Sequence, residues 1–407
     1  MSYGVTNFGR RFWVIAALSL APAVANSFAR FAYALLLPAM REELGLSYSQ
    51  AGSLNTANAL GYLVGAVFAA AYVSRLGNRR LFRFGMVVTV LALVGSGIAG
   101  GFIAQLCLRA IAGVGGAMVF ICGAVLASNV FPDRPDLSPT AIAVYFGGAG
   151  AGILLSGAGI PWLLAVAGDD AWRGAWLAIG GISAFFALLG MWSTRRIEEP
   201  SSGMQKSPWQ PSAFRAALGS YFLFGAGYIA YMTFVVAWMK SHGASALDVA
   251  LTWGTLGIAT MLAPIGWREP RSRWYPAKTL AAAGVILSVG AAIPLFSTLL
   301  PAMIVSAFLF GAAMFTVPTA VTDLVKTSLP KTAWGPAVAV FTVVFAVGQA
   351  IGPFLSGWLA DRTHSLYAGL AGSVIILVAA SAAAMYQTKS SAEVPHAARR
   401  SRRVTAQ

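Results

Sequence analysis

Arg30 is the residue of this chain best placed to do chemistry, because it lies inside an apolar stretch that runs from Ala25 to Pro38. A guanidinium at the centre of a membrane keeps its proton, and inserting it costs about 2.5 to 3.5 kcal/mol. Something in the folded protein must offset that cost. A bound anion would do so. The alternative is a structural cation that donates to helix carbonyls or neighbouring hydroxyls.

The composition predicts that Arg30 lies in a membrane protein. The chain has 407 residues, of which 58% are hydrophobic and only 10% are charged, and its mean hydropathy is +0.72. A soluble chain of this length would be far more polar. Apolar runs of about 20 residues cross a hydrocarbon core, so we predict an all-α membrane protein with twelve transmembrane helices. The predicted spans are residues 13–38, 49–73, 82–102, 104–130, 140–166, 172–193, 214–239, 247–267, 278–299, 301–325, 334–360 and 366–387.

The basic residues predict how these helices are oriented. Of the 28 Lys and Arg residues, 22 fall on the side of both chain ends, four fall on the opposite side, and Arg30 and Arg109 lie within spans. Because Lys and Arg concentrate in cytoplasmic loops, we expect a bacterial inner-membrane protein with both termini cytoplasmic. The net charge of +15 is dispersed over short loops, which disfavours a nucleic-acid partner. The basic tail is expected either to touch membrane lipids or to be a disordered end.

The chain repeats itself after about 200 residues. A shift of 198 positions places Tyr33 on Tyr231 and Gly113 on Gly311, and further matches keep the same order and offset. Such a repeat is typical of transporters built from two related halves. We therefore predict a first six-helix half over residues 1–193, a cytoplasmic linker over 194–213, a second half over 214–387, and a basic disordered tail over 388–407.

Three segments resemble motifs of the major facilitator superfamily, and the similarity covers essentially the whole chain. They are Ala70 to Arg80, which resembles Gly-x-x-x-Asp-Arg-x-Gly-Arg-Arg, then Arg109-Ala-Ile-Ala-Gly113, and Gly357-Trp-Leu-Ala-Asp-Arg362. Within the superfamily, Phe28 to Met40 is most similar to the YbfB/YjiJ-type group. The resemblance implies two pseudosymmetric six-helix bundles and an alternating-access secondary transporter for a small molecule. We expect it to act as a monomer.

The first of these motifs implies a gate. Arg75, Gly77 and Arg79 match the motif and are our candidate gating residues. The chain departs from the motif at Ala70, Ser74 and Asn78. The Asp that helps to lock the inner gate in relatives is therefore replaced here by Ser74.

Polar and aromatic residues at helical spacing predict a substrate site around Arg30. On the first span they share one face at i, i+4 and i+7, and the second span carries a similar stripe. Gln105 and Arg109 lie one turn apart on the fourth span, and the 198 offset relates Arg30 to Tyr228. The candidate substrate-binding residues are Asn26, Arg30, Tyr33, Asn55, Asn58, Tyr62, Arg109, Tyr228, Tyr231 and Gln349. For each the alternative is helix packing, and for Arg109 it is a structural or gating role.

The predicted substrate is a small organic anion, because Arg30 and Arg109 lie at membrane depth and no acidic residue lies centrally in a predicted span. A single Arg facing tyrosines suits a carboxylate. The guanidinium can donate to both carboxylate oxygens, while the aromatic rings contact the apolar part of the molecule. The rival function is an efflux pump for drugs or other apolar or neutral small molecules. Two buried cations suit cationic drugs poorly.

The same sequence predicts several absences. No Asp, Glu or His lies centrally in a span, which disfavours a carboxylate proton relay. Three His residues outside the spans cannot build a metal or catalytic cluster, so we expect neither a metal site nor an enzyme. The glycine runs at 147–152 and 348–357 follow no strand, so we expect no nucleotide cofactor. Their spacing instead favours close helix packing.

Overall fold

The computed structural model describes residues 2–199 and 209–387, and throughout these ranges the regular structure is helical. Eleven of the described helices are long and apolar enough to cross a membrane. One of them, α3 (Tyr48–Ile98), has 51 residues and breaks at Gly77, where φ is 78° and ψ is 158°. Its length provides two crossings, so the described residues make twelve crossings. The predicted all-α fold is confirmed.

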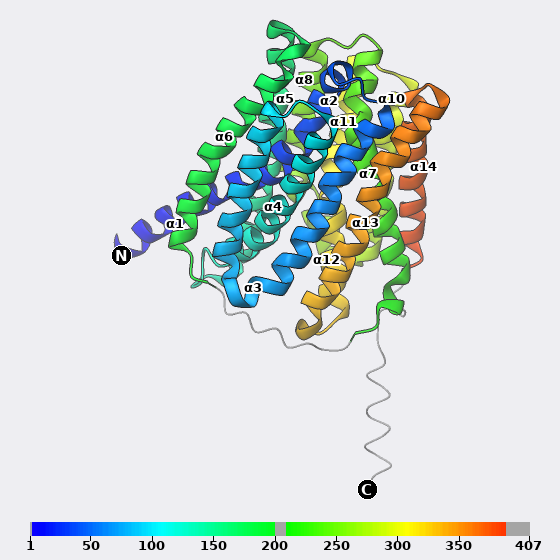
Figure 1. The fold of residues 1–407 in the computed structure, drawn as a ribbon. Helices are drawn as coiled ribbons and strands as arrows, with labels where there is room; N and C mark the ends of the chain where they lie inside the picture. Colours follow the sequence, from blue (N-terminus) through cyan, green and yellow to red (C-terminus); the bar gives the residue numbers. More distant parts are fainter. Residues whose placement is uncertain (1, 200–208, 388–407) are drawn as a thin grey trace.

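The remaining elements follow the chain in order (Figure 1). They are α1 (Ser2–Pro22), the π-helical segment η1 (Ala23–Phe31), α2 (Ala32–Glu43), α3, α4 (Phe102–Ser128), α5 (Ser138–Ala167), α6 (Trp172–Ser193), α7 (Arg215–Ser241), α8 (Ala246–Gly266), α9 (Arg268–Arg273), α10 (Pro276–Phe296), α11 (Leu300–Met314), α12 (Thr316–Ser328), α13 (Lys331–Thr363) and α14 (Leu366–Met385).

The turn that precedes α3 is repeated before α8. Gly45 has φ 61°, and Ser47 then caps α3 through its side chain. Gly243 has φ 79°, and Ser245 caps α8 in the same way. The left-handed conformation at both glycines is one that residues with a Cβ seldom adopt. The offset of 198 found in the sequence therefore reproduces a turn and a helix cap.

The packing of small residues is repeated as well. Gly113 of α4 lies against the backbone carbonyl of Asn58 on α3, and Gly311 of α11 lies against the carbonyl of Leu256 on α8. A Cβ at either glycine would overlap that carbonyl. Both partners are again related by 198 positions. The fold therefore consists of a first half, α1 to α6, and a second half, α7 to α14, with the same internal packing.

The two halves join most extensively along two pairs of helices, α3 with α13 and α5 with α8, and α2 also contacts α7. We call the end at which α6 ends and α7 begins the lower end, and the opposite end the upper end, as they lie in Figure 1. Within the described ranges, every hydrogen bond between the halves lies at the level of Arg30 or nearer the upper end. These bonds join Arg30 to Gln349, Asn55 to Thr233, Thr56 to Ala350, and both Tyr48 and Ser49 to Asp361.

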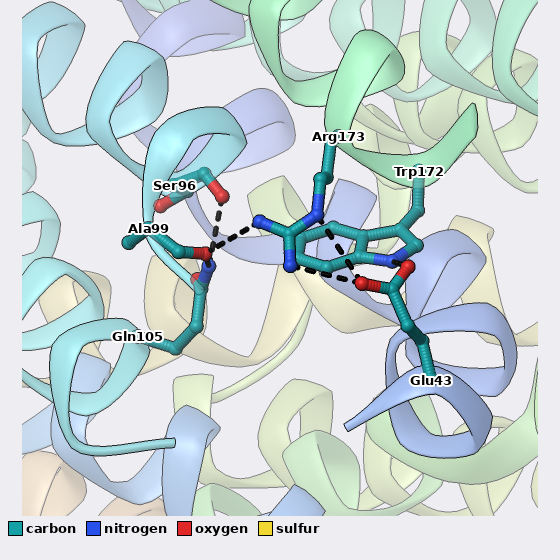
Figure 2. Close-up of polar contacts among 6 residues, drawn as sticks. All are labelled: Glu43, Ser96, Ala99, Gln105, Trp172 and Arg173. Carbon is teal, nitrogen blue, oxygen red and sulfur yellow. Dashed lines mark hydrogen bonds and ion pairs between the residues drawn. The ribbon is translucent and has the colours of Figure 1, made fainter. Parts of the chain in front are cut away.

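A polar network holds the upper end of the first half together (Figure 2). The carboxylate of Glu43 accepts from Arg173 at 2.9 Å and from the indole of Trp172. Arg173 and Gln105 both donate to the carbonyl of Ala99, at 2.9 and 3.0 Å. The network ties α2, α4 and α6 to the end of α3. Gln105, which lies one turn from Arg109 on α4, therefore binds the end of α3.

The helix bounds depart from the predicted spans in two places. The predicted tenth span, 301–325, is two helices, because Pro318 has no N–H to donate to the carbonyl of Met314, where α11 ends. The first crossing continues beyond the predicted 13–38 to Glu43, and Pro38 lies inside α2. Residues 200–208 of the predicted linker and the predicted tail over 388–407 lie outside the described residues.

We expect Gly357→Ala to destabilise the protein. A methyl group on Gly357 of α13 would overlap the carbonyl of Tyr48 on α3, at the joint between the halves. Overpacking of this kind costs about 1 to 3 kcal/mol, so the apparent melting temperature in detergent should fall by several degrees. Gly159→Ala on α5 adds the same methyl group where nothing lies within 4 Å, and it should leave the melting temperature unchanged. Equal melting temperatures for both variants would contradict the close packing.

Candidate functional site

A cavity of about 100 Å³ lies between the two halves, at the level of Arg30 and below it. Eight of its thirteen lining residues are aromatic, and Arg30 is the one charged residue among them. The lining consists of Asn26, Arg30, Phe31, Tyr62, Phe120, Tyr221, Phe224, Tyr228, Met314, Phe315, Pro318, Thr342 and Phe345. The site is therefore a small aromatic chamber with a single positive charge.

Arg30 occupies the wall of this chamber on the π-helical segment η1. Its Nη2 donates to Oε1 of Gln349 at 2.8 Å, and the amide nitrogen of Gln349 donates to the hydroxyl of Tyr228. The guanidinium carbon lies 5.3 Å from the centre of the Tyr62 ring. Within the described residues, the Arg30 side chain makes this one hydrogen bond and no ion pair. Its charge is thus left without a carboxylate partner.

Arg109 lies behind the chamber and is only 1% exposed. Its Nη1 donates to the carbonyl of Ala29 at 2.6 Å, and its Nη2 donates to the carbonyl of Arg30 at 3.3 Å and to Oδ1 of Asn55 at 2.7 Å. The guanidinium also lies 4.8 Å from the centre of the Tyr33 ring. Arg109 therefore binds the backbone of the segment that carries Arg30. This contact pattern is that of a positioning residue.

Asn55 and Asn58 take part in the same network. Asn55 accepts from Arg109 and donates through Nδ2 to the hydroxyl of Thr233 on α7 at 2.7 Å. Asn58 donates to the backbone carbonyl of Arg109 at 3.0 Å. Both amides are buried and bonded to protein groups, so they orient Arg109 and link it to the second half.

Tyr33 and Tyr231, which the repeat relates to each other, both point into their own halves. Tyr33 donates to the carbonyl of Ala51 at 2.8 Å, and the Tyr231 hydroxyl lies 2.8 Å from the hydroxyl of Ser306. Of the ten candidate substrate-binding residues, four line the cavity, namely Asn26, Arg30, Tyr62 and Tyr228. Gln349 touches two of these, and the other five lie outside the lining. Substrate contact by any of the ten stays a prediction.

The winding of the first crossing explains why Tyr33 departs from the predicted face. The prediction assumes 3.6 residues per turn from Asn26 to Tyr33, but η1 is π-helical over Ala23–Phe31. A π-helix forms i to i+5 hydrogen bonds, so residues after it are rotated relative to those within it. Asn26 and Arg30 lie within the segment and line the cavity, whereas Tyr33 follows the segment and does not.

Several lining residues were missed by the sequence reasoning. Tyr221 lies three residues before Phe224 and seven before Tyr228, so helical spacing on α7 could have found it. Phe120 and Phe345 lie in wholly apolar stretches of α4 and α13, where no spacing separates a lining ring from a packed one. Thr233, which accepts from Asn55 across the halves, is also beyond sequence reasoning.

The candidate gating residues lie at the lower end of the first half, beside an open groove. The backbone N–H of Arg79 donates to the carboxylate of Glu199 at 3.2 Å, and the Arg79 side chain donates to the carbonyl of Ile197 at 2.5 Å. A Cβ at Gly77 would lie 2.8 Å from the same carboxylate. Arg75 lines the groove without a hydrogen bond to Glu199 among the described contacts. Glu199, which the sequence reasoning missed, thus brings an acidic group to a motif that lacks its Asp.

The upper end is closed by Asp361 of α13. Its two carboxylate oxygens accept from the backbone N–H groups of Tyr48 and Ser49, each at 2.8 Å. These N–H groups lie at the N-terminus of α3, where a negative charge is favourable. Tyr48 itself lies between Arg41, 3.9 Å from its ring centre, and Phe234, at 6.2 Å between ring centres. The contact joins the halves and seals the chamber on this side.

Twelve crossings in two repeated halves, with a cavity between the halves that is closed at one end, define a secondary transporter of the major facilitator type. The model of one family, described as "Uncharacterised MFS-type transporter YbfB", matches residues 22–385. The chain belongs to this family. The YbfB resemblance found in the sequence is therefore confirmed.

Curated relatives and solved structures agree with this assignment. Uncharacterized MFS-type transporters YcaD from Salmonella arizonae and Salmonella typhi are 29% identical over 140 residues. That match spans 34% of this chain and 35% of the length of the relatives. A bacterial homologue of the human lysosomal transporter Spinster, in an inward-facing and occupied conformation, has TM-score 0.73 and 18% identity, covering 95% of this chain and 99% of that one. A D-xylose-proton symporter has TM-score 0.75 and 14% identity, covering 94% and 99%. These structures share the fold.

We expect Arg109→Gln to destabilise the protein and Arg30→Gln not to do so. Arg109 makes three hydrogen bonds that hold η1 and Asn55, and a hydrogen bond to a charged group contributes about 1.5 kcal/mol or more. Arg30 makes one such bond, and its removal also relieves a buried, unpaired charge. Melting temperatures in detergent should fall for Arg109→Gln and stay level or rise for Arg30→Gln. The reverse order would contradict these assignments.

Proposed function

We propose that the protein moves a small organic monoanion, a carboxylate, by alternating access between its two halves. The observation that carries the proposal is Arg30. It lines the cavity between the halves, and among the described residues no carboxylate pairs with it. A buried cation retained in that position costs free energy unless an anion offsets it. A bound substrate carboxylate supplies the missing charge.

We propose that one carboxylate oxygen of the substrate takes the place of Gln349 Oε1. Its Oε1 already accepts from Arg30 Nη2 at 2.8 Å, so an amide oxygen occupies the place that a substrate oxygen would take. A carboxylate is a stronger acceptor than an amide for a guanidinium and binds through two oxygens. Substrate binding would displace Gln349 from Arg30. Because Gln349 belongs to the second half, this exchange would alter a bond between the halves.

The same geometry supports alternating access. The hydrogen bonds between the halves lie at the level of Arg30 or above it, and the cavity lies below. We propose that residues 1–193 and 214–387 rock as two units, opening the Asp361 contact as the lower end closes. Following the distribution of Lys and Arg, we assign the lower end and both chain termini to the cytoplasm. In this proposal the structure is an inward-facing state of a monomer in a bacterial inner membrane.

The wall of the cavity also favours a second candidate function. Eight aromatic rings in one lining could hold an apolar or neutral molecule, as an efflux pump would. The charge of Arg30 distinguishes the two functions, because an uncharged ligand does not offset the free-energy cost of burying the guanidinium. None of the thirteen described lining residues is Asp, Glu or His. In place of a carboxylate proton relay we propose exchange, facilitated movement, or symport in which the substrate carries its own proton.

We expect small carboxylates to stabilise the purified, full-length protein in a thermal-shift screen and matched neutral amides to have no effect. Arg30→Gln should abolish the shift, because the carboxylate loses its charge-assisted hydrogen bonds. Arg30→Lys should restore part of it, because an ammonium keeps the charge without the two-pronged geometry. Transport by reconstituted vesicles should follow the same order.

Arg215→Gln provides a matched control, since it removes an exposed Arg at the lower end and should leave both measurements unchanged. Selective stabilisation by neutral or cationic compounds would favour efflux. Undiminished carboxylate transport by a folded Arg30→Gln variant would overturn the proposed function.

A further inference from the structure

Four aromatic rings of the cavity wall form one ordered stack. Tyr221, Phe224 and Tyr228 follow i, i+3 and i+7 along α7, and Phe345 approaches them from α13. Tyr221 and Phe345 stack with their ring centres 4.6 Å apart, and Phe224 and Tyr228 stack at 4.8 Å. Five pairs among these four rings are in contact, and in each pair the two ring planes lie within 15° of each other.

The parallel arrangement is confined to the side of the cavity wall that the second half provides. Tyr62 and Phe120, the rings from α3 and α4 that also line the cavity, meet at 63°. The four-ring stack instead lines the cavity with parallel rings from the second half. Offset stacking at 4.5 to 7 Å between centres is a favourable geometry for a further aromatic ring. A planar ring in the cavity could therefore continue a stack that already exists.

The stack and the charge are close to each other. Tyr228, a member of the stack, accepts from Gln349, and Gln349 accepts from Arg30. One amide side chain thus separates the guanidinium from the stacked rings. A ligand that places its carboxylate on Arg30 while displacing Gln349 would carry its adjoining atoms toward the ring of Tyr228.

The size of the cavity limits the ligand. About 100 Å³ is available, and an engineered apolar cavity of about 150 Å³ is known to bind one benzene ring. The chamber is smaller than that cavity, so we propose a ligand of no more than one ring, whose carboxylate takes space that Gln349 gives up when it is displaced from Arg30. Met314 and Thr342 complete the wall with one flexible apolar group and one hydroxyl.

We propose that the substrate is a monocyclic aromatic carboxylate, whose carboxylate binds Arg30 and whose ring continues the stack of Tyr221, Phe224, Tyr228 and Phe345. This inference rests on the proposed function and narrows its substrate class. The stack acts as the specificity-determining wall. It selects a flat π-system over a saturated ring of the same size.

The test compares three ligands of one size by isothermal titration of the full-length protein in detergent. Benzoate should bind about 3-fold to 10-fold more tightly than cyclohexanecarboxylate, because only benzoate stacks. Benzamide keeps the ring without the charge and should bind far more weakly than benzoate. Equal affinity for benzoate and cyclohexanecarboxylate would overturn the aromatic preference and leave the proposed function standing. Equal affinity for benzoate and benzamide would overturn the proposed function itself. No binding of benzoate would overturn the substrate class proposed here, while the screen of other small carboxylates still tests the proposed function.

Variants of the stacked residues test whether these rings cause the preference for benzoate over cyclohexanecarboxylate. Phe224→Leu and Phe345→Leu each remove a stacked ring but keep an apolar side chain. Each should reduce the preference for benzoate to within about 2-fold while changing the affinity for cyclohexanecarboxylate little. Phe185→Leu on α6 is the matched control, because Phe185 is 58% exposed and lies outside the cavity lining. A full preference for benzoate in both folded stack variants would show that the stack does not select the ring, and the proposal would fail.

Discussion

The fold is organised around two positive charges that the membrane interior disfavours. Arg109 is offset by protein groups, since it donates to the carbonyls of Ala29 and Arg30 and to Asn55. Among the described residues, the Arg30 side chain donates only to the amide oxygen of Gln349. The difference separates a cation that serves the structure from one that is available to a ligand. Both depend on η1, because this π-helical segment carries Arg30 and supplies the carbonyls that Arg109 binds.

The bonds around these charges also connect the two halves. Arg109 reaches Thr233 of the second half through Asn55, and Arg30 reaches Tyr228 through Gln349. Nearer the upper end, Asp361 binds the first N–H groups of α3. The Gln349 contact is the one that a substrate anion could compete for. In the proposed function, substrate binding and the arrangement of the halves are therefore linked at Arg30.

The two halves keep the same scaffold while their cavity residues differ. The turns at Gly45 and Gly243 and the close contacts of Gly113 and Gly311 recur at one offset. At the position related to Arg30, the second half has Tyr228, which belongs to an aromatic stack. One half thus supplies a charge and the other supplies ring faces. An asymmetric ligand, charged at one end and planar at the other, matches that division.

The sequence by itself determined the twelve crossings, the repeat and the presence of Arg30 at membrane depth, because hydropathy, a constant offset and a charge within an apolar run are all local or periodic signals. Only the tertiary structure decided which candidates face the cavity. Helical spacing grouped Asn26, Arg30 and Tyr33, but the π-helical winding of η1 turned Tyr33 away. The stack with Phe345 joins α7 to α13, and a contact between residues more than 100 positions apart leaves no trace in the spacing of either helix.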